Sequence, residues 1–230
     1  MVKNARQTLE RPRREPLTRV RIIRAALRIM DEEGLDSVTM RHVGNELGVE
    51  AMSLYNHVQD KEDILDGICE EVLAEFRVPQ ADDWGQAVRL GAHEYRRLLL
   101  AHPNVITLMT ERHKPFTTAE SLRAYEWVLD VFRSAGLSLK DSVQAFYVLG
   151  GYILGYVTME LGLMVGSPED DAHLRAHQDM ERLLQSADLP RLREAFPLFV
   201  ENDVDQQFDF GLDLLIEGLR ARIAAGTSSP

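Results

Sequence analysis

The segment at residues 49–57, VEAMSLYNH, is rich in side chains that form hydrogen bonds. Four of them are short or rigid donors and acceptors: Ser53, Tyr55, Asn56 and His57. Such groups suit phosphate oxygens and the edges of bases, while Leu54 can anchor a short helix to a core. The segment is a candidate nucleic-acid-binding helix, although periodicity alone also fits an ordinary surface helix.

Two histidines four residues apart, His173 and His177, form a second candidate site. Acidic residues precede them at 169–171, and on a helix this spacing would place both imidazoles on one face, as a Zn²⁺ site requires. A polar surface segment collects the same residue types for solubility. The sequence leaves metal binding at these positions open, and we assign no metal site.

Motifs typical of enzymes are missing from the sequence. It contains no Ser/His/Asp elbow, P-loop or dinucleotide-binding motif, and Gly150, Gly151 and Gly155 fall in an apolar helical stretch where they serve close packing. A helical bundle can house a reactive centre, but the Glu-x-x-His motif of such bundles is absent, since Leu163 stands at that offset from Glu160. We therefore expect that the protein is not an enzyme and needs no cofactor. The alternative to a nucleic-acid-binding protein is an all-α bundle that binds a small molecule or catalyses a reaction and does not bind DNA.

Composition predicts a globular cytoplasmic protein. The chain has 230 residues, of which 45% are apolar and 27% charged, and its single cysteine, Cys69, has no disulfide partner. The N-terminus lacks the apolar core of a secretory signal. The uncharged run at 142–159 reaches the lower length limit of a membrane span, but its polar residues and glycines indicate a buried helix of a bundle instead. We expect no membrane association.

Charge is distributed unevenly along the chain. The net charge is −11, yet residues 1–28 carry nine Lys or Arg against two Glu, while residues 62–230 carry 15 basic and 28 acidic residues. A basic N-terminal part on an acidic body indicates that the N-terminal part faces nucleic acid. A DNA-coating protein without an effector would be basic throughout.

Apolar periodicity predicts helices and no strand. The first four span about 17–33, 39–47, 49–57 and 60–76. Gly34 is expected to end the first in a left-handed cap, and Gly48 to end the second. The apolar residues expected to pack in the first and third are Val20, Ile23, Ala26, Leu27, Met30, Val49, Met52 and Leu54.

Further helices are predicted after the break at Pro79. They begin near Trp84, Asn104 and residue 117, and two longer ones span about 139–165 and 203–224. Ser138 and Asp141 resemble a capping box for the first of these. The polar segment 166–202 contains Pro168, Pro190 and Pro197 and is expected to be a loop or lid with short helices.

The segment TMRHVGNELGVEAMSLYNHVQDKEDILD resembles the DNA-binding segment of the tetracycline-repressor (TetR) family, and FDFGLDLLIEGLR is similar to the last helix of its tetracycline-repressor-like subgroup. The resemblance implies an all-α fold with an N-terminal three-helix helix-turn-helix head and a larger helical ligand-binding and dimerisation domain. The implied divisions are a basic flexible arm at 1–16, the DNA-binding domain at 17–78 and the second domain at 79–230. The function it implies is a transcriptional regulator, a repressor that binds a palindromic double-stranded DNA operator as a homodimer and is released by a small effector.

The resemblance also implies site residues. Arg41 would reach a base edge, Thr39, Tyr55, His57 and Lys61 would contact phosphates, and Ala51, Met52 and Ser53 would face bases. The full set of implied DNA-binding positions is Thr39, Met40, Arg41, Glu50, Ala51, Met52, Ser53, Tyr55, Asn56, His57 and Lys61. Tetracycline repressors have Gln, Pro and Trp where this chain has Ala51, Met52 and Asn56, so a different operator is expected.

The effector also differs from tetracycline in this comparison. Arg77, Gly91, Tyr95 and Met109 stand where tetracycline repressors hold the drug and its Mg²⁺ with two His, an Asn and a Phe, so neither imidazole is present. We expect an apolar pocket for a lipophilic or aromatic ligand. Its expected lining is Arg77, Tyr95, Leu99, Met109, Trp127, Phe146 and Tyr147. Each of these apolar residues equally suits a packed core.

Overall fold

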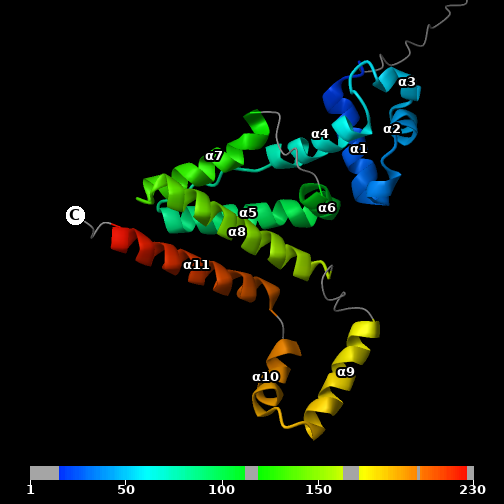
Figure 1. The fold of residues 1–230 in the computed structure, drawn as a ribbon. Helices are drawn as coiled ribbons and strands as arrows, with labels where there is room; N and C mark the ends of the chain where they lie inside the picture. Colours follow the sequence, from blue (N-terminus) through cyan, green and yellow to red (C-terminus); the bar gives the residue numbers. More distant parts are fainter. Residues whose placement is uncertain (1–15, 112–118, 163–170, 201–202, 227–230) are drawn as a thin grey trace, which may run out of the picture. The chain divides into compact units, whose positions relative to one another are not determined.

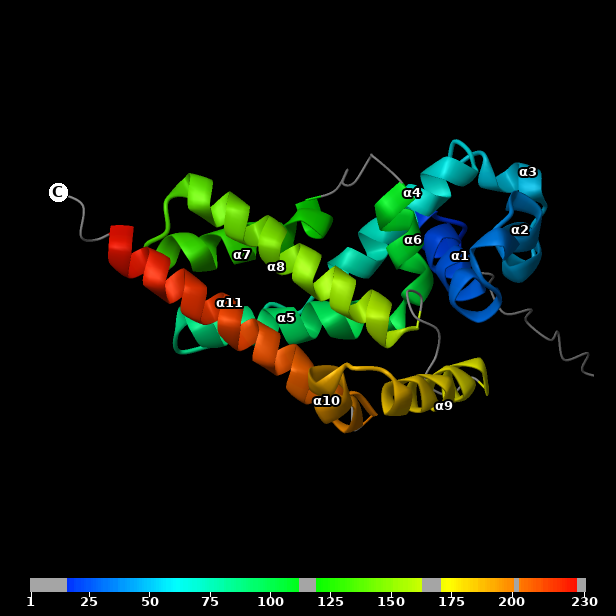
Figure 2. The same ribbon diagram turned by 60° about the horizontal axis from the view of Figure 1, so that its bottom comes forward.

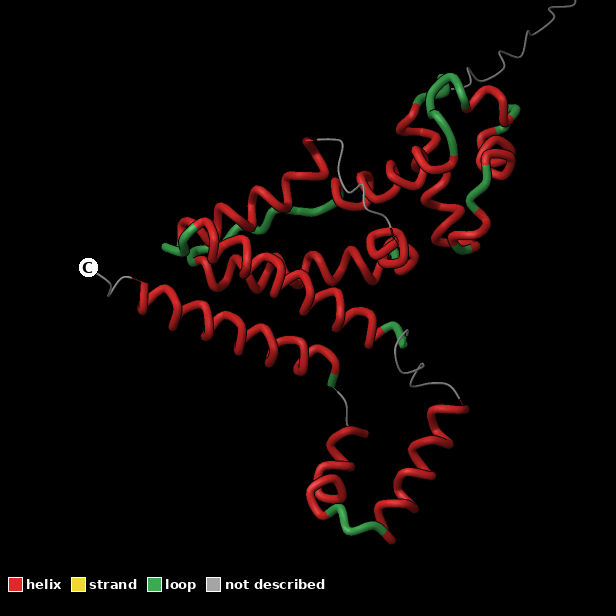
Figure 3. Tube along the Cα trace, viewed as in Figure 1, coloured by secondary structure: helices red, strands yellow, loops and turns green. Residues whose placement is uncertain are grey.

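The computed structural model describes residues 16–111, 119–162, 171–200 and 203–226 (Figure 1). All regular elements in this described part are helices, which confirms the all-α prediction, and Figure 3 colours no strand. The predicted N-terminal arm lies outside the described residues except for its last position. The chain divides into two compact units, one ending at Ile68 and one beginning at Cys69. This boundary falls inside α4 (Lys61–Ala74), so one helix contributes to both units.

The first unit contains α1 (Arg19–Glu33), the 3₁₀ turn η1 (Leu35–Ser37), α2 (Met40–Leu47), α3 (Ala51–Leu54) and the first half of α4. α1 packs against η1 and α2, and α2 packs against α3. Aliphatic side chains with almost no exposed surface fill the centre: Ile22, Met30, Val43, Leu54 and Ile64. The predicted order of short helices is therefore confirmed.

Two details of α1 differ from the prediction. Val20 was placed on the buried stripe, but its side chain is 49% exposed, and Ile22 lies in the core instead. Gly34 ends the helix with a positive φ of 89°, but its ψ of 166° lies outside the left-handed helical region. Its N–H still donates to Met30 O at 3.0 Å, so the helix end is capped by an extended glycine.

The second unit is built around α5 (Trp84–Ala101), which contacts α6 (Pro103–Glu111), α7 (Ala119–Ser134), α8 (Leu139–Glu160) and α11 (Val204–Gly226). Figure 2 shows α8 and α11 running alongside α5. Capping residues fix the helix starts: Asp83 accepts from the N–H groups of Gly85 and Gln86, and Ser138 Oγ accepts from Asp141 N at 3.0 Å, as predicted. α8 ends at Glu160, a few residues before the predicted end.

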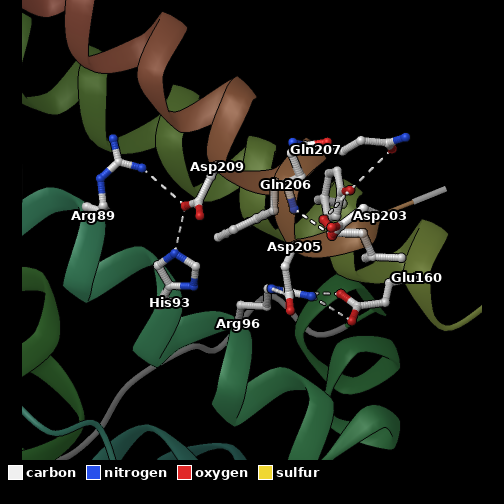
Figure 4. Close-up of polar contacts among 12 residues, drawn as sticks. Arg89, His93, Arg96, Glu160, Asp203, Asp205, Gln206, Gln207 and Asp209 are labelled. Atoms are coloured by element: carbon white, nitrogen blue, oxygen red, sulfur yellow. Dashed lines mark hydrogen bonds and ion pairs between the residues drawn. The ribbon is translucent and has the colours of Figure 1, made fainter. Parts of the chain in front are cut away.

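An ionic network around the buried side chain of Arg96 joins α5, α8 and α11 (Figure 4). Arg96 donates through Nε and Nη2 to the two carboxylate oxygens of Glu160, each at 2.8 Å, and through Nη1 to Asp205 at 2.7 Å. Its guanidinium carbon lies 4.9 Å from the ring centroid of Phe208. Because Arg96 is buried, this bidentate geometry compensates a charge removed from water.

The polar segment 166–202 is more helical than predicted. It contains α9 (Asp171–Ser186) and α10 (Pro190–Val200), which pack against each other. Pro190 begins α10, where its missing N–H needs no partner, and Pro197 is accommodated inside the helix. Sequence reasoning treated both prolines as breaks and so underestimated the helix content.

None of the helices in the described part of the chain is long and apolar enough to cross a membrane. The uncharged run at 142–159 lies in α8, which buries one face along its whole length. Ser142, Leu149 and Val157 are buried there, whereas Val148 is 55% exposed.

Candidate nucleic-acid interface and ligand cavity

The turn between α2 and α3 has the geometry that a helix-turn-helix needs. Thr39 caps α2, its Oγ1 accepting from His42 N at 3.1 Å. Gly48 ends α2 in the left-handed region, with φ 67° and ψ 35°, as expected for a glycine in this position. The N–H of Val49 then donates to Gly44 O at 2.9 Å. The chain thus reverses within three residues and starts α3 at Ala51.

Gly44 sets the distance between α2 and α3. A Cβ atom at this position would lie 3.0 Å from Val49 O and 3.2 Å from Ala51 N. Both neighbours are backbone atoms, so a larger residue would force the two helices apart. Sequence reasoning missed this residue, although a glycine inside a predicted helix was the available signal.

α3 is held from one side and exposed on the other. Leu54 and Val58 are buried, whereas the side chain of Met52 is 72% exposed and that of Tyr55 48% exposed. Met52 was predicted both to pack in the core and to face bases; its exposure excludes the first role. α3 is also shorter than predicted, since residues 55–57 form a turn after Leu54.

The other implied DNA-contacting residues occupy the same unit. Four of them are exposed: Arg41, Glu50, Asn56 and His57. Thr39, the N-cap residue of α2, is exposed as well. Partly buried positions are Met40, Ala51, Ser53 and Lys61, the last being the first residue of α4. The unit therefore offers Arg41 from α2, Met52 from α3 and a polar turn after α3 to the solvent. Their contact with DNA stays a prediction.

Asp63 fixes the start of α4 within this unit. Its Oδ1 accepts from Arg19 Nη2 at 2.8 Å, and its Oδ2 accepts from Gln59 N at 2.9 Å. Burial alone would raise the pKa of Asp63, but the bonds from Arg19 and Gln59 and the charge of Arg19 outweigh it, and the pKa lies below the ordinary value. The same carboxylate therefore binds α1 and holds the loop after α3. Asp60 caps α4 by accepting from Asp63 N at 2.9 Å.

An apolar cavity of about 220 Å³ lies within the second unit. Its walls come from α5, α7, α8 and the residues around the end of α4. Four of the predicted pocket residues line it: Tyr95, Trp127, Phe146 and Tyr147. Gly91, which stands at a tetracycline-contact position in the family comparison but was not in the expected lining, also lines it. Phe76, Tyr125, Gly150 and Gly151 line it as well and were not predicted, because neither glycines nor further helix aromatics differ in sequence from core residues.

Aromatic rings form two groups around the cavity. The ring centroids of Phe76 and Trp127 are 5.6 Å apart, and those of Tyr125 and Phe146 are 4.9 Å apart. Tyr147 packs edge-on against Phe146 at 5.5 Å. Such tilted and edge-to-face pairs are the favoured arrangements of aromatic side chains.

The predicted residues Leu99, Met109 and Arg77 are placed differently. Leu99 is fully buried in the core, and Met109 is not among the lining residues, with its sulfur 3.8 Å from the hydroxyl of Tyr95. Arg77 is exposed, and its backbone N–H donates to Glu94 at 3.1 Å. None of the three lines the cavity. The predicted ligand contacts of Leu99, Met109 and Arg77 are therefore not supported by their positions.

The side chains of His173 and His177 lie outside the described residues. Within the part of the chain whose side chains are described, no group of three or more potential ligands is arranged to hold a metal ion. His93 instead pairs with a carboxylate: its Nε2 lies 2.8 Å from Asp209 Oδ1, and Arg89 contacts the same oxygen at 3.1 Å (Figure 4).

Comparisons with known proteins agree with this arrangement. Residues 22–68 match the model of bacterial regulatory proteins of the tetR family, and residues 78–223 match that of the tetracyclin repressor-like C-terminal domain. An HTH-type transcriptional regulator of Saccharopolyspora erythraea is 30% identical, with 89% of this chain and 85% of the relative covered. The class D tetracycline repressor from Escherichia coli is also 30% identical, with 91% of this chain and 92% of the repressor covered.

A solved structure extends the similarity to three dimensions. The Streptomyces coelicolor TetR family protein ActR, crystallised in complex with actinorhodin, is 27% identical and covers 91% of this chain and 99% of its own, with a TM-score of 0.76. The similarity therefore includes both the helix-turn-helix unit and the unit that contains the cavity.

Proposed function

Because the chain belongs to the tetracycline-repressor family of DNA-binding transcriptional regulators, we propose that it is a repressor. It binds a palindromic operator as a homodimer in the cytoplasm and leaves the DNA when a small lipophilic or aromatic molecule fills the cavity. Residues 17–78 form its DNA-binding domain and residues 79–230 its effector and dimerisation domain. The observation that carries the proposal is the capped and exposed helix-turn-helix at residues 39–57.

The DNA-contacting residues have separate roles in this proposal. Arg41 reads a base edge in the major groove, and Ala51, Met52 and Ser53 face the bases from α3. Tyr55, His57 and Lys61 hold phosphates and thereby set the position of α3. The exposure of Arg41, Met52 and Tyr55 supports these roles, and the burial of Leu54 gives α3 a fixed anchor.

Dimerisation is proposed through α8 and α11. Both helices leave large apolar side chains exposed within the chain: Val143, Tyr147, Val148, Met159, Phe210 and Leu214. Clustered exposed apolar side chains mark interaction surfaces. A two-fold dimer also explains function, because two recognition helices about 34 Å apart can read successive half-sites.

The glycines of α8 were expected to allow close approach of helices at this interface. Within the chain, a Cβ at Gly150, Gly151 or Gly155 would meet nothing within 4 Å, so none of these glycines is needed for packing inside one protomer. Gly150 and Gly151 also line the cavity. A substitution at Gly151 would therefore perturb ligand binding and dimerisation together, and a cleaner test lies on α11.

The cavity supports effector control. Aromatic and aliphatic residues line it, and no histidine is among the described lining residues, whereas tetracycline repressors bind Mg²⁺ through imidazoles; we therefore propose metal-independent binding of an apolar effector. Release requires that the effector bind better to a conformation whose recognition helices no longer fit the operator. α4, which contributes residues to both units, is the proposed connection.

The proposal is tested by operator selection from random duplex DNA, followed by sedimentation of the complex. The selected sites should be inverted repeats, and the protein should sediment as a dimer. Phe210→Glu should shift it towards monomer and weaken operator binding, whereas Leu122→Glu on α7, also exposed, should change neither. A monomeric wild type that binds single half-sites equally well would contradict the proposal.

A further inference from the structure

The side chains exposed on α3 restrict the sequence of the operator. We infer that Met52 contacts the C5-methyl group of a thymine in the major groove, so that each half-site carries a thymine at the position that α3 faces. This role rests on the proposed function, in which Met52 faces the bases. It is supported by the exposure of Met52, by the fixed position of α3 and by the chemistry of the side chains at the start of that helix.

Met52 points away from the core of its own unit. At 72%, it is the most exposed large apolar side chain in the part of the chain whose exposure is described, whereas Leu54 is fully buried. Residues two apart on a helix lie about 200° apart around its axis, so the burial of Leu54 directs Met52 outwards. An apolar side chain held in water gains free energy by covering apolar surface of a partner.

The unit holds α3 at both ends, so Met52 is presented at a defined place. After the helix, Val58 N donates to Leu54 O at 3.0 Å, and both side chains are buried. At its start, a Cβ at Gly44 would lie 3.2 Å from Ala51 N, so α2 and α3 are in close contact. Reading a single methyl group requires such a fixed geometry, because dispersion attraction weakens steeply when atoms move apart.

The two side chains exposed at the start of α3 cannot donate a hydrogen bond. Glu50 and Met52 are exposed there, whereas Ala51 and Ser53 are partly buried. An ionised carboxylate only accepts hydrogen bonds, and a thioether is a weak acceptor. In the major groove, thymine is the base whose edge carries a methyl group, while the other bases present only donors and acceptors. Another base opposite Met52 would lose water without gaining a hydrogen bond, so Met52 favours thymine.

Replacement of thymine by deoxyuridine tests the role of Met52, because uracil lacks the C5-methyl group and keeps the same hydrogen-bonding edge. The duplexes derive from an operator selected with the full-length wild-type protein. Each thymine is replaced in turn, in both half-sites together, and affinity is measured by fluorescence anisotropy of the labelled DNA. 5-Bromodeoxyuridine at the same position carries a group of similar size to methyl and serves as the chemical rescue.

Wild type should bind about 15-fold more weakly when the thymines that face Met52 are replaced, as expected for two buried methyl groups at about fourfold each. Bromodeoxyuridine should restore the affinity. Met52→Ala, and Met52→Gln as a second variant with a side chain of the same length, should bind the thymine and uracil duplexes equally. Met180→Ala, which truncates an exposed methionine of α9, is the matched control and should keep the wild-type ratio. Because each result is a ratio for one protein preparation, partial unfolding of a variant does not change it.

The role of Met52 is overturned if no thymine of the selected operator is sensitive to the loss of its methyl group, if the sensitivity persists in both Met52 variants, or if Met180→Ala loses it as well. Failure of the proposed function gives a different result. A protein that selects no operator refutes both proposals, whereas operator binding without an effect of uracil refutes only the contact between Met52 and thymine.

Discussion

Gly91 of α5 makes room for the indole of Trp127 of α7. A Cβ at position 91 would lie 2.4 Å from Cη2 and 2.5 Å from Cζ3 of that ring, distances that no packed core tolerates. Trp127 in turn contacts Phe76, which follows the end of α4 by two residues. The absence of one side chain thus fixes the position of a ring that lines the cavity.

Gly91→Ala should therefore have opposite effects in two backgrounds. In wild type, overpacking against the indole costs about 1–3 kcal/mol, which exceeds the helix-propensity gain of up to about 1 kcal/mol; the free energy of unfolding should fall. With Trp127→Phe the ring is smaller, and Gly91→Ala should then be neutral or stabilising. Urea denaturation of the four proteins measures this cycle. Equal effects in both backgrounds would show that the contact does not limit position 91.

Arg41 and Tyr55 should affect operator binding in different ways. Arg41→Ala should lower discrimination at one operator position by about 1–3 kcal/mol, because a base contact is lost. Tyr55→Phe should weaken binding similarly for all sequences, because a phosphate contact carries no sequence information. Binding-site selection with each variant distinguishes the two. If Arg41→Ala selects the same operator sequences as the wild type, the base-reading role of Arg41 is refuted.

Asp63 should make stability depend on pH in the acidic range. Its pKa is lowered from 3.8 in the folded protein, so the pair with Arg19 contributes stability above about pH 4, and this contribution is lost as the pH falls through the folded pKa. Asp63→Asn should lower the free energy of unfolding by about 1 kcal/mol at pH 7, and the difference from wild type should shrink towards pH 3. Denaturation at both pH values checks it. Glu46→Gln, whose pair with Arg28 is more exposed, is the control and should change little.

Loss of the Arg96 side chain should lower the free energy of unfolding strongly, because its partner Glu160 would then be left as an uncompensated, largely buried charge. Arg96→Met leaves Glu160, which is only 20% exposed, without its two hydrogen bonds, and should cost about 3 kcal/mol. Adding Glu160→Leu should recover much of this loss, because no uncompensated charge remains. Asp205→Asn should cost under about 1 kcal/mol, since Asp205 is 80% exposed. Thermal and urea unfolding test the series; additive losses in the double variant would contradict this account.

Phe76 is the residue at which we expect ligand binding to be coupled to α4. It lines the cavity and contacts Trp127, whereas Arg77, the residue favoured by sequence register, points to solvent. Phe76→Ala should reduce the effect of ligand on operator affinity, a coupling of about 1–3 kcal/mol in typical systems, and leave ligand-free operator affinity nearly intact. Arg77→Ala should leave both unchanged. Anisotropy titrations of labelled operator DNA, with and without a compound that binds in the cavity, decide between the two residues.

The sequence by itself determined the helical class and the helix-turn-helix. These depend on local rules: Thr39 and Asp60 cap helices with their own side chains, and Gly48 supplies the left-handed conformation that ends α2. Such interactions join residues within a few positions of each other, so their signals can be read directly from spacing.

Only the tertiary structure decided which residues share the cavity and the network. Leu99 and Tyr95 lie one helical turn apart on α5, yet one is buried in the core and the other lines the cavity. Gly91 matters because Trp127 reaches it from another helix, and Arg96 is buried because Glu160 and Asp205 meet it from two others. Apolar periodicity identifies the buried side of a helix but not its partner, since contacts between distant segments depend on how the helices pack together.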